Sequence, residues 1–310
     1  MRGYLGIDTS NYTTSCAICR AGKVVQQKRL LPVPQGQVGL RQSDAVFSHV
    51  KALGELMEQL RRDDNGPIDA IGVSCRPRDL EGSYMPCFCA GEMAARTAAA
   101  AMGVPLYRFS HQAGHIAAAL YGAGRIDLVN RSFVAFHLSG GTTESVWVRS
   151  LLSADMPLLS GSSDLNAGQV IDRVGHLLGL PFPAGPSLDA LAQNSQQRYR
   201  VRIKFHEGGP CLSGVENQCA AMLQKGAPHA DIARYALDAI LSALIGMIDR
   251  AREATHCDTM LFAGGVMSNS IIRPEIERYC GGIFAPRDYS CDNAAGIAVL
   301  TALQREEPFG

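Results

Sequence analysis

A strand-turn-strand pattern occurs twice in this chain and constrains the fold more than any other feature of the sequence. Residues 8–15 read DTSNYTTS and residues 137–144 read HLSGGTTE. With an offset of 129 residues (137 minus 8), the serine and both threonines coincide. Each copy follows a short apolar run and leads into an alternating one. A repeated supersecondary unit of this kind predicts two duplicated halves.

The hydrophobic periodicity between these landmarks predicts alternating strands and helices. In the first half it predicts strands over residues 5–8, 13–19, 23–30, 68–74 and 104–109, and helices over 43–61, 91–102 and 111–121. In the second half it predicts strands over 132–138, 142–148, 198–205, 259–262 and 282–285, and helices over 167–178, 186–192, 231–254, from about 268, and 291–303. We expect Ser43 or Asp44 to cap the first helix and Trp147 to pack in the core.

Together these elements predict an α/β fold of two duplicated lobes. The lobes are expected to span residues 1–128 and 129–310, with the last helix packing back on the first lobe. This is the architecture of actin, the sugar kinases and the heat-shock ATPases, with nucleotide and metal in the cleft between the lobes. Those proteins usually place an acid in each half to hold magnesium. Here Asp8 corresponds to His137, which argues against an ordinary kinase.

Charge and cysteine usage limit the function classes. The formal net charge is zero, so nucleic acid would have to bind through a local patch. No apolar stretch reaches transmembrane length, and the chain begins without a signal-peptide pattern. The ten cysteines lack paired C-x-x-C zinc spacing, and Cys16 and Cys19 fall on opposite faces of a predicted strand. We therefore expect a cytoplasmic protein with free thiols and no membrane contact.

The segment HQAGH at residues 111–115 places two histidines four residues apart at the start of a predicted helix. This spacing puts both imidazoles on one helical face, where they can share one metal ion. Asp292, far downstream, offers a carboxylate that would complete the site. Two ordinary helix histidines give the same pattern, and the spacing alone does not separate the two interpretations. The candidate metal ligands are His111, His115 and Asp292.

Two glycine turns follow predicted strands, SGG at 139–141 and GG at 264–265. Such a turn presents backbone N–H groups to an anion, and glycine lets the backbone approach a phosphate closely. Asn269 follows the second turn in the sequence and is a candidate to bond a ribose or a base. Asp172 and Asp189 flank a proline-rich loop and are candidates to bond ribose hydroxyls. Glycine turns are common in α/β proteins, but two of them within a repeat indicate nucleotide binding.

Over essentially its whole length the chain resembles the universal tRNA threonylcarbamoyl transferase family, once labelled glycoprotease. The resemblance rests on a series of short motifs in a fixed order. They are HQAGH at 111–115, SGG at 139–141, GQVIDR at 168–173, LLGL at 177–180, PAGP at 183–186, LSG at 212–214, GGV at 264–266 with Asn269, and Asp292-Asn293.

The resemblance implies a function and a set of site residues. His111, His115 and Asp292 would hold one divalent metal, iron or zinc. The adenylate of threonylcarbamoyl-AMP, or a related AMP or ATP, would be bound by His137, Leu138, Ser139, Gly140, Gly141, Asp172, Gly185, Asp189, Gly264, Gly265 and Asn269. Asp8 and Ser10, in the first turn, are the candidate catalytic residues. The family transfers threonylcarbamoyl to N6 of a tRNA adenosine and works with partner subunits, so tRNA and other tRNA-modification proteins are the expected partners.

The sequence also departs from the family near the reacting centre. The family carries an acidic pair in its first turn, within a pattern ETSCDET, where this chain has Tyr12 and Thr13. Loss of the pair leaves open an alternative function, a nucleotide- and metal-binding paralogue that acts as a partner subunit or on another acceptor. A metalloprotease is disfavoured because no glutamate adjoins His111 or His115 as a general base.

Arg76, Arg78 and Arg96 are either a local phosphate-binding patch or ordinary loop and helix charges. The sequence does not decide between these two interpretations.

Overall fold

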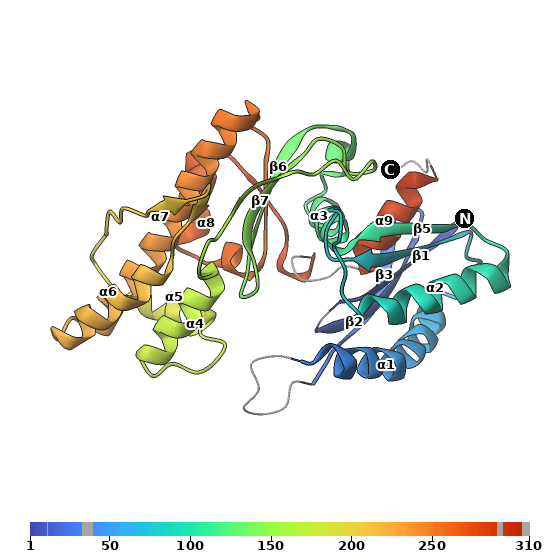
Figure 1. The fold of residues 1–310 in the computed structure, drawn as a ribbon, viewed down its shortest axis with the longest axis horizontal. Coiled ribbons are helices and arrows are strands. Elements are labelled where there is room, and N and C mark those ends of the chain that lie inside the picture. Colours follow the sequence, from blue (N-terminus) through green and yellow to red (C-terminus); the bar gives the residue numbers. More distant parts are fainter. Residues whose placement is uncertain (11, 33–39, 290–293, 306–310) are drawn as a thin grey trace. The chain divides into compact units, whose positions relative to one another are not determined.

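The computed structural model describes residues 1–10, 12–32, 40–289 and 294–305. The chain divides into two compact units, each assembled from more than one stretch of sequence. Unit 1 comprises Met1–Asn130, Ser150–Asp155 and Asp288–Gly310, and unit 2 comprises Arg131–Arg149 and Met156–Arg287. Each unit has a five-stranded sheet carrying helices (Figure 1).

The sheet of unit 1 joins an antiparallel meander to two parallel strands. Its strands are β1 (Gly3–Thr9), β2 (Thr13–Arg20), β3 (Lys23–Leu30), β4 (Ala70–Arg76) and β5 (Leu106–Ser110). Their order is β3-β2-β1-β4-β5, with β1, β2 and β3 antiparallel and with β4 and β5 parallel to β1. Nearly every residue of β1 and β2 is buried, as expected for strands covered on both faces.

Helices cover both faces of this sheet. They are α1 (Gln42–Asp63), α2 (Phe88–Met102), α3 (His111–Gly122) and α9 (Ala294–Gln304), and a 3-10 turn, η1 (Ile126–Asn130), follows α3. Side chains of α1 and α2 pack with Ile18 on one face, and those of α9 pack with Ala17 on the other. Cys16 and Cys19 lie in these two opposite clusters, as the alternation of β2 predicted.

Glycines let α9 approach the backbone of its neighbours in unit 1. A Cβ on Gly6 of β1 would lie 2.4 Å from the carbonyl oxygen of Ala294 and 2.4 Å from the nitrogen of Ala298. A Cβ on Gly296 would lie 1.8 Å from the carbonyl oxygen of Gly114 in α3. Any side chain at these positions would separate α9 from β1 and α3.

Unit 2 repeats the sheet of unit 1. Its strands are β6 (Phe133–Leu138), β7 (Thr143–Val148), β8 (Leu158–Gly161), β11 (Met260–Ala263) and β12 (Ile283–Phe284). Their order is β12-β11-β6-β7-β8, again with an antiparallel meander and two parallel strands. Asp8 pairs with Ser15 and His137 pairs with Glu144, so the 129-residue offset also relates the registers. The predicted duplication is therefore confirmed.

The helices of unit 2 build one large core. They are α4 (Ala167–Leu177), α5 (Gly185–Ala192), α6 (Ser213–Gln224), α7 (His229–Thr255) and α8 (Ile272–Cys280), with the 3-10 turns η2 (Gly265–Ser268) and η3 (Arg287–Tyr289, the latter crossing into unit 1). The α7 helix lies at the centre, where Leu237, Ile240 and Leu244 are at most 1% exposed. Two short strands, β9 (Phe205–His206) and β10 (Gly209–Pro210), form a separate hairpin.

The strand predicted over residues 198–205 is wrong except at its end. Only Phe205 belongs to a strand, and residues 195–204 have no regular secondary structure. The alternation itself is real, since Val201, Ile203 and Phe205 pack against the core while the residues between them are exposed. The inward side chains pack against helices. The backbone of the segment has no neighbouring strand to pair with among the described residues.

Two further expectations are corrected, and two elements were missed. The α1 helix begins at Gln42 with Arg41 in the capping position and no side-chain cap, so Ser43 and Asp44 lie inside the first turn. Trp147 is half-buried rather than packed in the core, because its indole N–H donates to Ser132 at 2.6 Å and the guanidinium of Arg149 lies over its ring. The periodicity also did not reveal β8 or α6.

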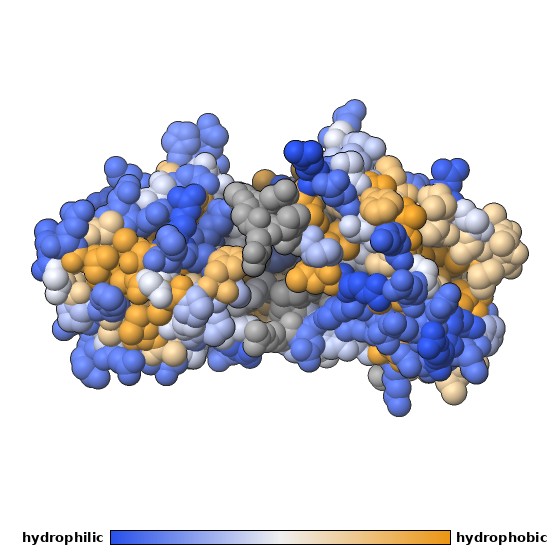
Figure 2. All heavy atoms as spheres, turned by 90° about the horizontal axis from the view of Figure 1, so that it is seen from below, coloured by the Kyte–Doolittle hydropathy of each residue, from blue (hydrophilic) through white to orange (hydrophobic). Residues whose placement is uncertain are grey.

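The described surface mixes hydrophilic and hydrophobic groups (Figure 2). Phe182, 84% exposed, and Leu30, 73% exposed, are among its large hydrophobic side chains. Within residues 1–10, 12–32, 40–289 and 294–305, no helix combines the length and the apolar character needed to span a membrane.

Candidate functional site

Asp8 and the two histidines meet at one edge of the sheet of unit 1. Asp8 is the penultimate residue of β1 and His111 follows β5 directly, and these strands run parallel, so their carboxyl ends share an edge. The edge at the carboxyl ends of parallel strands is where α/β proteins bind ligands. The predicted helix is confirmed: α3 starts at His111, with the Ser110 side chain accepting the N–H of Ala113 at 3.1 Å. The imidazole centroids of His111 and His115 are 4.6 Å apart.

A hydrogen bond joins Asp8 to His111. The carboxylate of Asp8 is fully buried and accepts the Nδ1–H of His111 at 2.8 Å and the N–H of Ser10 at 3.1 Å. Burial alone raises the pKa of Asp8, but the adjacent His111 and the hydrogen bonds outweigh it, so the pKa lies below its usual value. Asp8 is therefore ionised and fixes the orientation of the His111 ring.

This arrangement fits a metal-binding histidine pair. Histidines that bind metals nearly always donate their second ring N–H to a carboxylate or carbonyl, as His111 does to Asp8. The third predicted ligand, Asp292, lies outside the residues that the structure describes. In the described part of the chain, no three His, Cys, Asp or Glu side chains gather closely enough to hold a metal ion.

His49, which no sequence pattern indicated, is a buried imidazole of unit 1, whereas His111 and His115 are partly buried. It lies on α1, is fully buried, and shares a 2.8 Å hydrogen bond between its Nδ1 and the hydroxyl of Thr14. Burial lowers the pKa of His49, although the nearby Asp8 charge raises it, so the ring is neutral at pH 7. The position is hard to find from sequence, because a histidine in an amphipathic helix usually faces solvent.

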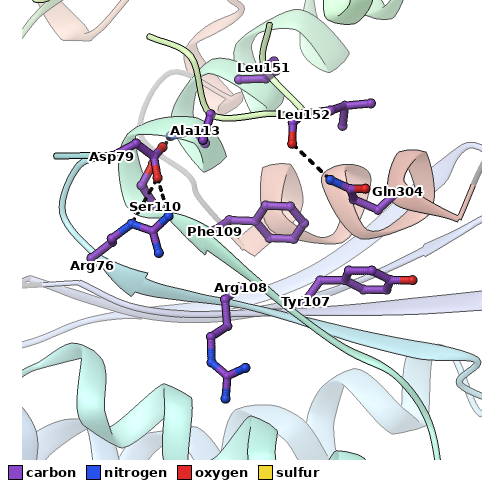
Figure 3. Close-up of a pocket in the computed structure, with 11 residues that line it drawn as sticks. Arg76, Asp79, Tyr107, Arg108, Phe109, Ser110, Ala113, Leu151, Leu152 and Gln304 are labelled. Carbon is purple, nitrogen blue, oxygen red and sulfur yellow. Dashed lines mark hydrogen bonds and ion pairs between the residues drawn. The ribbon is translucent and has the colours of Figure 1, made fainter. Parts of the chain in front are cut away.

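The Arg76 loop has a structural explanation. Arg76 forms a two-pronged ion pair with Asp79 at 2.5 and 3.0 Å, and Asp79 also accepts the hydroxyl of Ser110. The loop lines a pocket of about 80 Å³ in unit 1, with Phe109 in the middle and Gln304 donating to the carbonyl of Leu152 (Figure 3). Because its charge is neutralised by Asp79, Arg76 is an ordinary loop charge.

In unit 2, the first glycine turn is held by its own serine. The side-chain oxygen of Ser139 accepts the N–H groups of Gly141 at 3.3 Å and Thr142 at 3.1 Å. A Cβ on Gly140 or Gly141 would meet nothing within 4 Å. Among the described residues the N–H of Gly140 has no hydrogen-bond partner. The turn therefore leaves one donor and open space for a ligand.

The N-terminus of α4 packs directly on this turn. The N–H of Ala167 donates to the hydroxyl of Thr143 at 2.7 Å, and the N–H of Gly168 donates to the carbonyl of Ser139 at 3.1 Å. A Cβ on Gly168 would lie 2.5 Å from the nitrogen of Gly140. The first N–H groups of α4 thus fix the turn instead of facing a ligand.

The second glycine turn lies beside the first. Ala263 of β11 is level with His137 of β6, so both turns leave the same edge of the sheet. Gly264 has φ +96°, a conformation that L side chains rarely adopt, and a Cβ there would lie 2.2 Å from the carbonyl oxygen of Leu138. The structure thus brings residues 137–141 and 264–265 together. The predicted helix after this turn begins later, at Ile272, with η2 before it.

The remaining predicted nucleotide residues are engaged within unit 2. Asn269 is 8% exposed, and its side-chain oxygen accepts the N–H groups of Ile271 and Ile272, both at 3.0 Å. Asp189 accepts the N–H and the hydroxyl of Ser270 at 2.9 and 2.8 Å. A ligand would therefore share or displace these contacts.

Asp172 holds the approach to α5. Its carboxylate accepts the N–H of Ala184 at 2.9 Å, directly before Gly185 starts α5. Asp172 thus binds the residue before α5, and Gly185 and Asp189 both lie on α5. Their predicted contacts with ribose stay predictions.

Comparison with known proteins extends over nearly the whole chain. The family model of TsaD, tRNA N6-adenosine threonylcarbamoyltransferase, matches residues 34–299. Proteins named tRNA N6-adenosine threonylcarbamoyltransferase from two strains of Thermus thermophilus are each 31% identical over 98% of this chain, covering 94% and 93% of their own lengths.

Solved structures share the fold at low sequence identity. Full-length HypF in its phosphate- and nucleotide-bound form gives a TM-score of 0.65 at 10% identity, covering 99% of this chain and 56% of that one. Component A of the (R)-2-hydroxyglutaryl-CoA dehydratase of Acidaminococcus fermentans gives 0.58 at 17%, covering 98% and 99%. A hexokinase of the ROK family from Thermus thermophilus gives 0.53 at 15%, covering 98% and 100%.

The hexokinase and its relatives bear out the fold class that the internal repeat predicted. The family model matches far more than half of the chain, and the two Thermus proteins exceed 30% identity along almost all of it. The chain belongs to the tRNA N6-adenosine threonylcarbamoyltransferase family.

Proposed function

We propose that this protein transfers the threonylcarbamoyl group of threonylcarbamoyl-AMP to N6 of a tRNA adenosine. The observation that carries the proposal is the family match over residues 34–299. In the reaction, the N6 amine attacks the carbamoyl carbonyl and forms a C–N bond. The C–O bond to AMP breaks, and the amine loses a proton.

Unit 1 would bind the metal. His111 and His115 would be two of its ligands, with Asp292 as the third, and Asp8 would orient His111 through the Nδ1 hydrogen bond. A bound iron or zinc ion supplies a Lewis acid that polarises a carbonyl oxygen. Ser10 would act through its N–H, which steadies the Asp8 carboxylate at 3.1 Å.

Unit 2 would bind the adenylate. Its phosphate would lie at the Ser139–Gly141 and Gly264–Gly265 turns, where the N–H of Gly140 can donate to a phosphate oxygen. Asp172, Gly185, Asp189 and Asn269 would contact the nucleoside. The supporting observation is that the two turns lie side by side at one sheet edge.

A nucleoside assay by mass spectrometry tests the proposal. The metal-loaded chain is mixed with threonylcarbamoyl-AMP and unmodified tRNA, with and without the partner proteins of the same cell. We expect threonylcarbamoyladenosine with the wild type, none with His111→Ala, and full product with His229→Ala, a matched change at an exposed helix start. Metal content should fall in His111→Ala alone, with the circular dichroism spectrum unchanged.

One observation favours a second function. Tyr12, 43% exposed, and Thr13 occupy the positions where the family resemblance places an acidic pair. Without those carboxylates the chain would bind metal and adenine nucleotide as a partner subunit, or would serve another acceptor. Binding of AMP or ATP without product under every condition of the assay would establish this alternative.

A further inference from the structure

Four cations follow one another at every second residue between α5 and α6. They are Arg198, Arg200, Arg202 and Lys204, which we call the basic ladder, and all four are exposed. The three residues between them are each partly buried. Alternate residues of an extended segment point to opposite sides, so the four cations project from the same side of the segment.

The segment runs beside α7 of unit 2 (Figure 1). Its inward side chains contact residues of that helix. The ring of Tyr199 lies 5.4 Å from that of Tyr235, and the N–H of Tyr199 donates to Asp238 at 2.8 Å. At the other end, the ring of Phe205 packs against Gly246, so closely that a Cβ on Gly246 would lie 2.7 Å from it. The guanidinium of Arg250 lies over the ring of Phe205. The ladder is therefore presented on an ordered backbone.

Among the described residues, three of the four cations of the basic ladder lack an acidic partner. Arg198 pairs with Glu275 at 2.9 Å, whereas Arg200, Arg202 and Lys204 make no ion pair or side-chain hydrogen bond with any described residue. A buried acid close by, Asp238, already binds Arg234 at 2.9 Å and the N–H of Tyr199. Since the formal net charge of the chain is zero, this positive charge is a local feature.

We propose that the basic ladder binds the phosphate backbone of the RNA substrate, a proposal that rests on the tRNA-directed function above. Cations two residues apart on an extended chain recur every ~6.6 Å, which suits a regular row of phosphates. Guanidinium groups match phosphate oxygens with two parallel hydrogen bonds. Contacts of this kind position an RNA and carry no sequence information, so the ladder would fix how the tRNA lies on unit 2.

Binding of unmodified tRNA to the full chain, followed by fluorescence anisotropy across about 50 to 200 mM salt, tests the ladder. The test variant is Arg200→Glu, Arg202→Glu and Lys204→Glu, with the three matching Gln changes as a milder version. The control carries the same charge change at Lys23→Glu, Arg131→Glu and Lys225→Glu, three exposed cations that are not part of the ladder. Circular dichroism checks that every variant is folded.

The ladder variant should bind tRNA about 10- to 100-fold more weakly. In a plot of log affinity against log salt concentration, its slope should be less steep than that of the wild type by about two to three. The Gln version should lose less, and the control should stay within about twofold of the wild type. Equal losses in the ladder variant and the control would overturn the proposal, as would no binding of tRNA by the wild type. Ladder-dependent binding of poly-glutamate without binding of tRNA would overturn it in favour of an acidic protein partner.

These outcomes are independent of the chemistry. Ladder-dependent tRNA binding without threonylcarbamoyladenosine in the nucleoside assay would keep the ladder and reject the transferase. Product formation with equal tRNA affinity in the ladder variant and the wild type would keep the transferase and reject the ladder.

Discussion

At the residue scale, Asn269 carries a structural contact as well as its proposed ligand contact. Its side-chain oxygen caps two N–H groups at the start of α8, through Ile271 and Ile272. Its amide nitrogen has no hydrogen-bond partner among the described residues. The oxygen therefore stabilises the fold, and the nitrogen is the group left for a nucleotide.

Two substitutions separate these roles. Asn269→Ala removes both groups and should lower the free energy of unfolding by about 0.5–2 kcal/mol, the usual cost of a lost cap. Asn269→Asp keeps an oxygen acceptor for the cap and loses the donor. We expect it to unfold in urea like the wild type but to bind AMP more weakly by calorimetry. Unchanged AMP affinity in Asn269→Asp would remove Asn269 from the nucleotide site.

Sequence spacing predicted part of the candidate site at this scale. The i, i+4 rule placed His111 and His115 side by side, and their centroids are 4.6 Å apart. The bond between His111 and Asp8 was not predicted, because 103 residues separate them and only the strand order brings them together. His49 was missed because its burial depends on the sheet beneath α1.

At the element scale, the contact between α4 and the Ser139–Gly141 turn depends on one missing side chain. Gly168 lies in the first turn of α4, and a Cβ there would lie 2.5 Å from the nitrogen and 2.7 Å from the Cα of Gly140. Both atoms are backbone, so a clash can be relieved only by moving the helix or the turn.

Gly168→Ala should therefore lower stability by about 1–3 kcal/mol and weaken AMP binding, because the turn is displaced. The control is Gly54→Ala, also in a helix, where a Cβ would meet nothing within 4 Å. That change should raise stability by about 0.5–1 kcal/mol. Urea unfolding and calorimetry measure both quantities. A stabilised Gly168→Ala with normal AMP affinity would show that the turn tolerates a shift.

Periodicity predicted most helices and strands of the fold, and its failures at residues 198–204 and at the start of α1 each have a physical cause. Residues 198–204 alternate like a strand, but their apolar side chains pack against the core of unit 2 and their backbone has no neighbouring strand in the described part of the chain. An alternation of apolar and polar residues therefore shows that one side of the segment is buried and the other exposed. It does not show whether a neighbouring strand is present to pair with the backbone. At the start of α1, Arg41 takes the capping position because the N–H groups of Asp44 and Ala45 bond to its carbonyl.

At the scale of the whole molecule, α9 completes unit 1 although it lies at the other end of the chain from β1. It covers the sheet face that contains Tyr4, Ala17 and Cys19, and its alanines pack against them. Unit 1 without α9 would expose this apolar face to water.

A chain that ends at Arg287 should therefore lose the fold of unit 1. Hydrogen exchange is expected to show unprotected amides in β1 and β2, with protection kept in β6 and β11 of unit 2. Adding a peptide of residues 288–310 should restore part of the protection. Full protection of β1 in the shortened chain without the peptide would show that α9 is dispensable.

The chain passes between the two units four times, at residues 130/131, 149/150, 155/156 and 287/288. The unit of duplication and the unit of folding therefore have different boundaries. A gene cut after residue 130 would separate the two repeats but leave unit 1 without Ser150–Asp155 and α9. A single crossover with the gene of a relative after residue 130 would exchange the second repeat together with Ser150–Asp155 and α9, so unit 1 would then be assembled from segments of both parents.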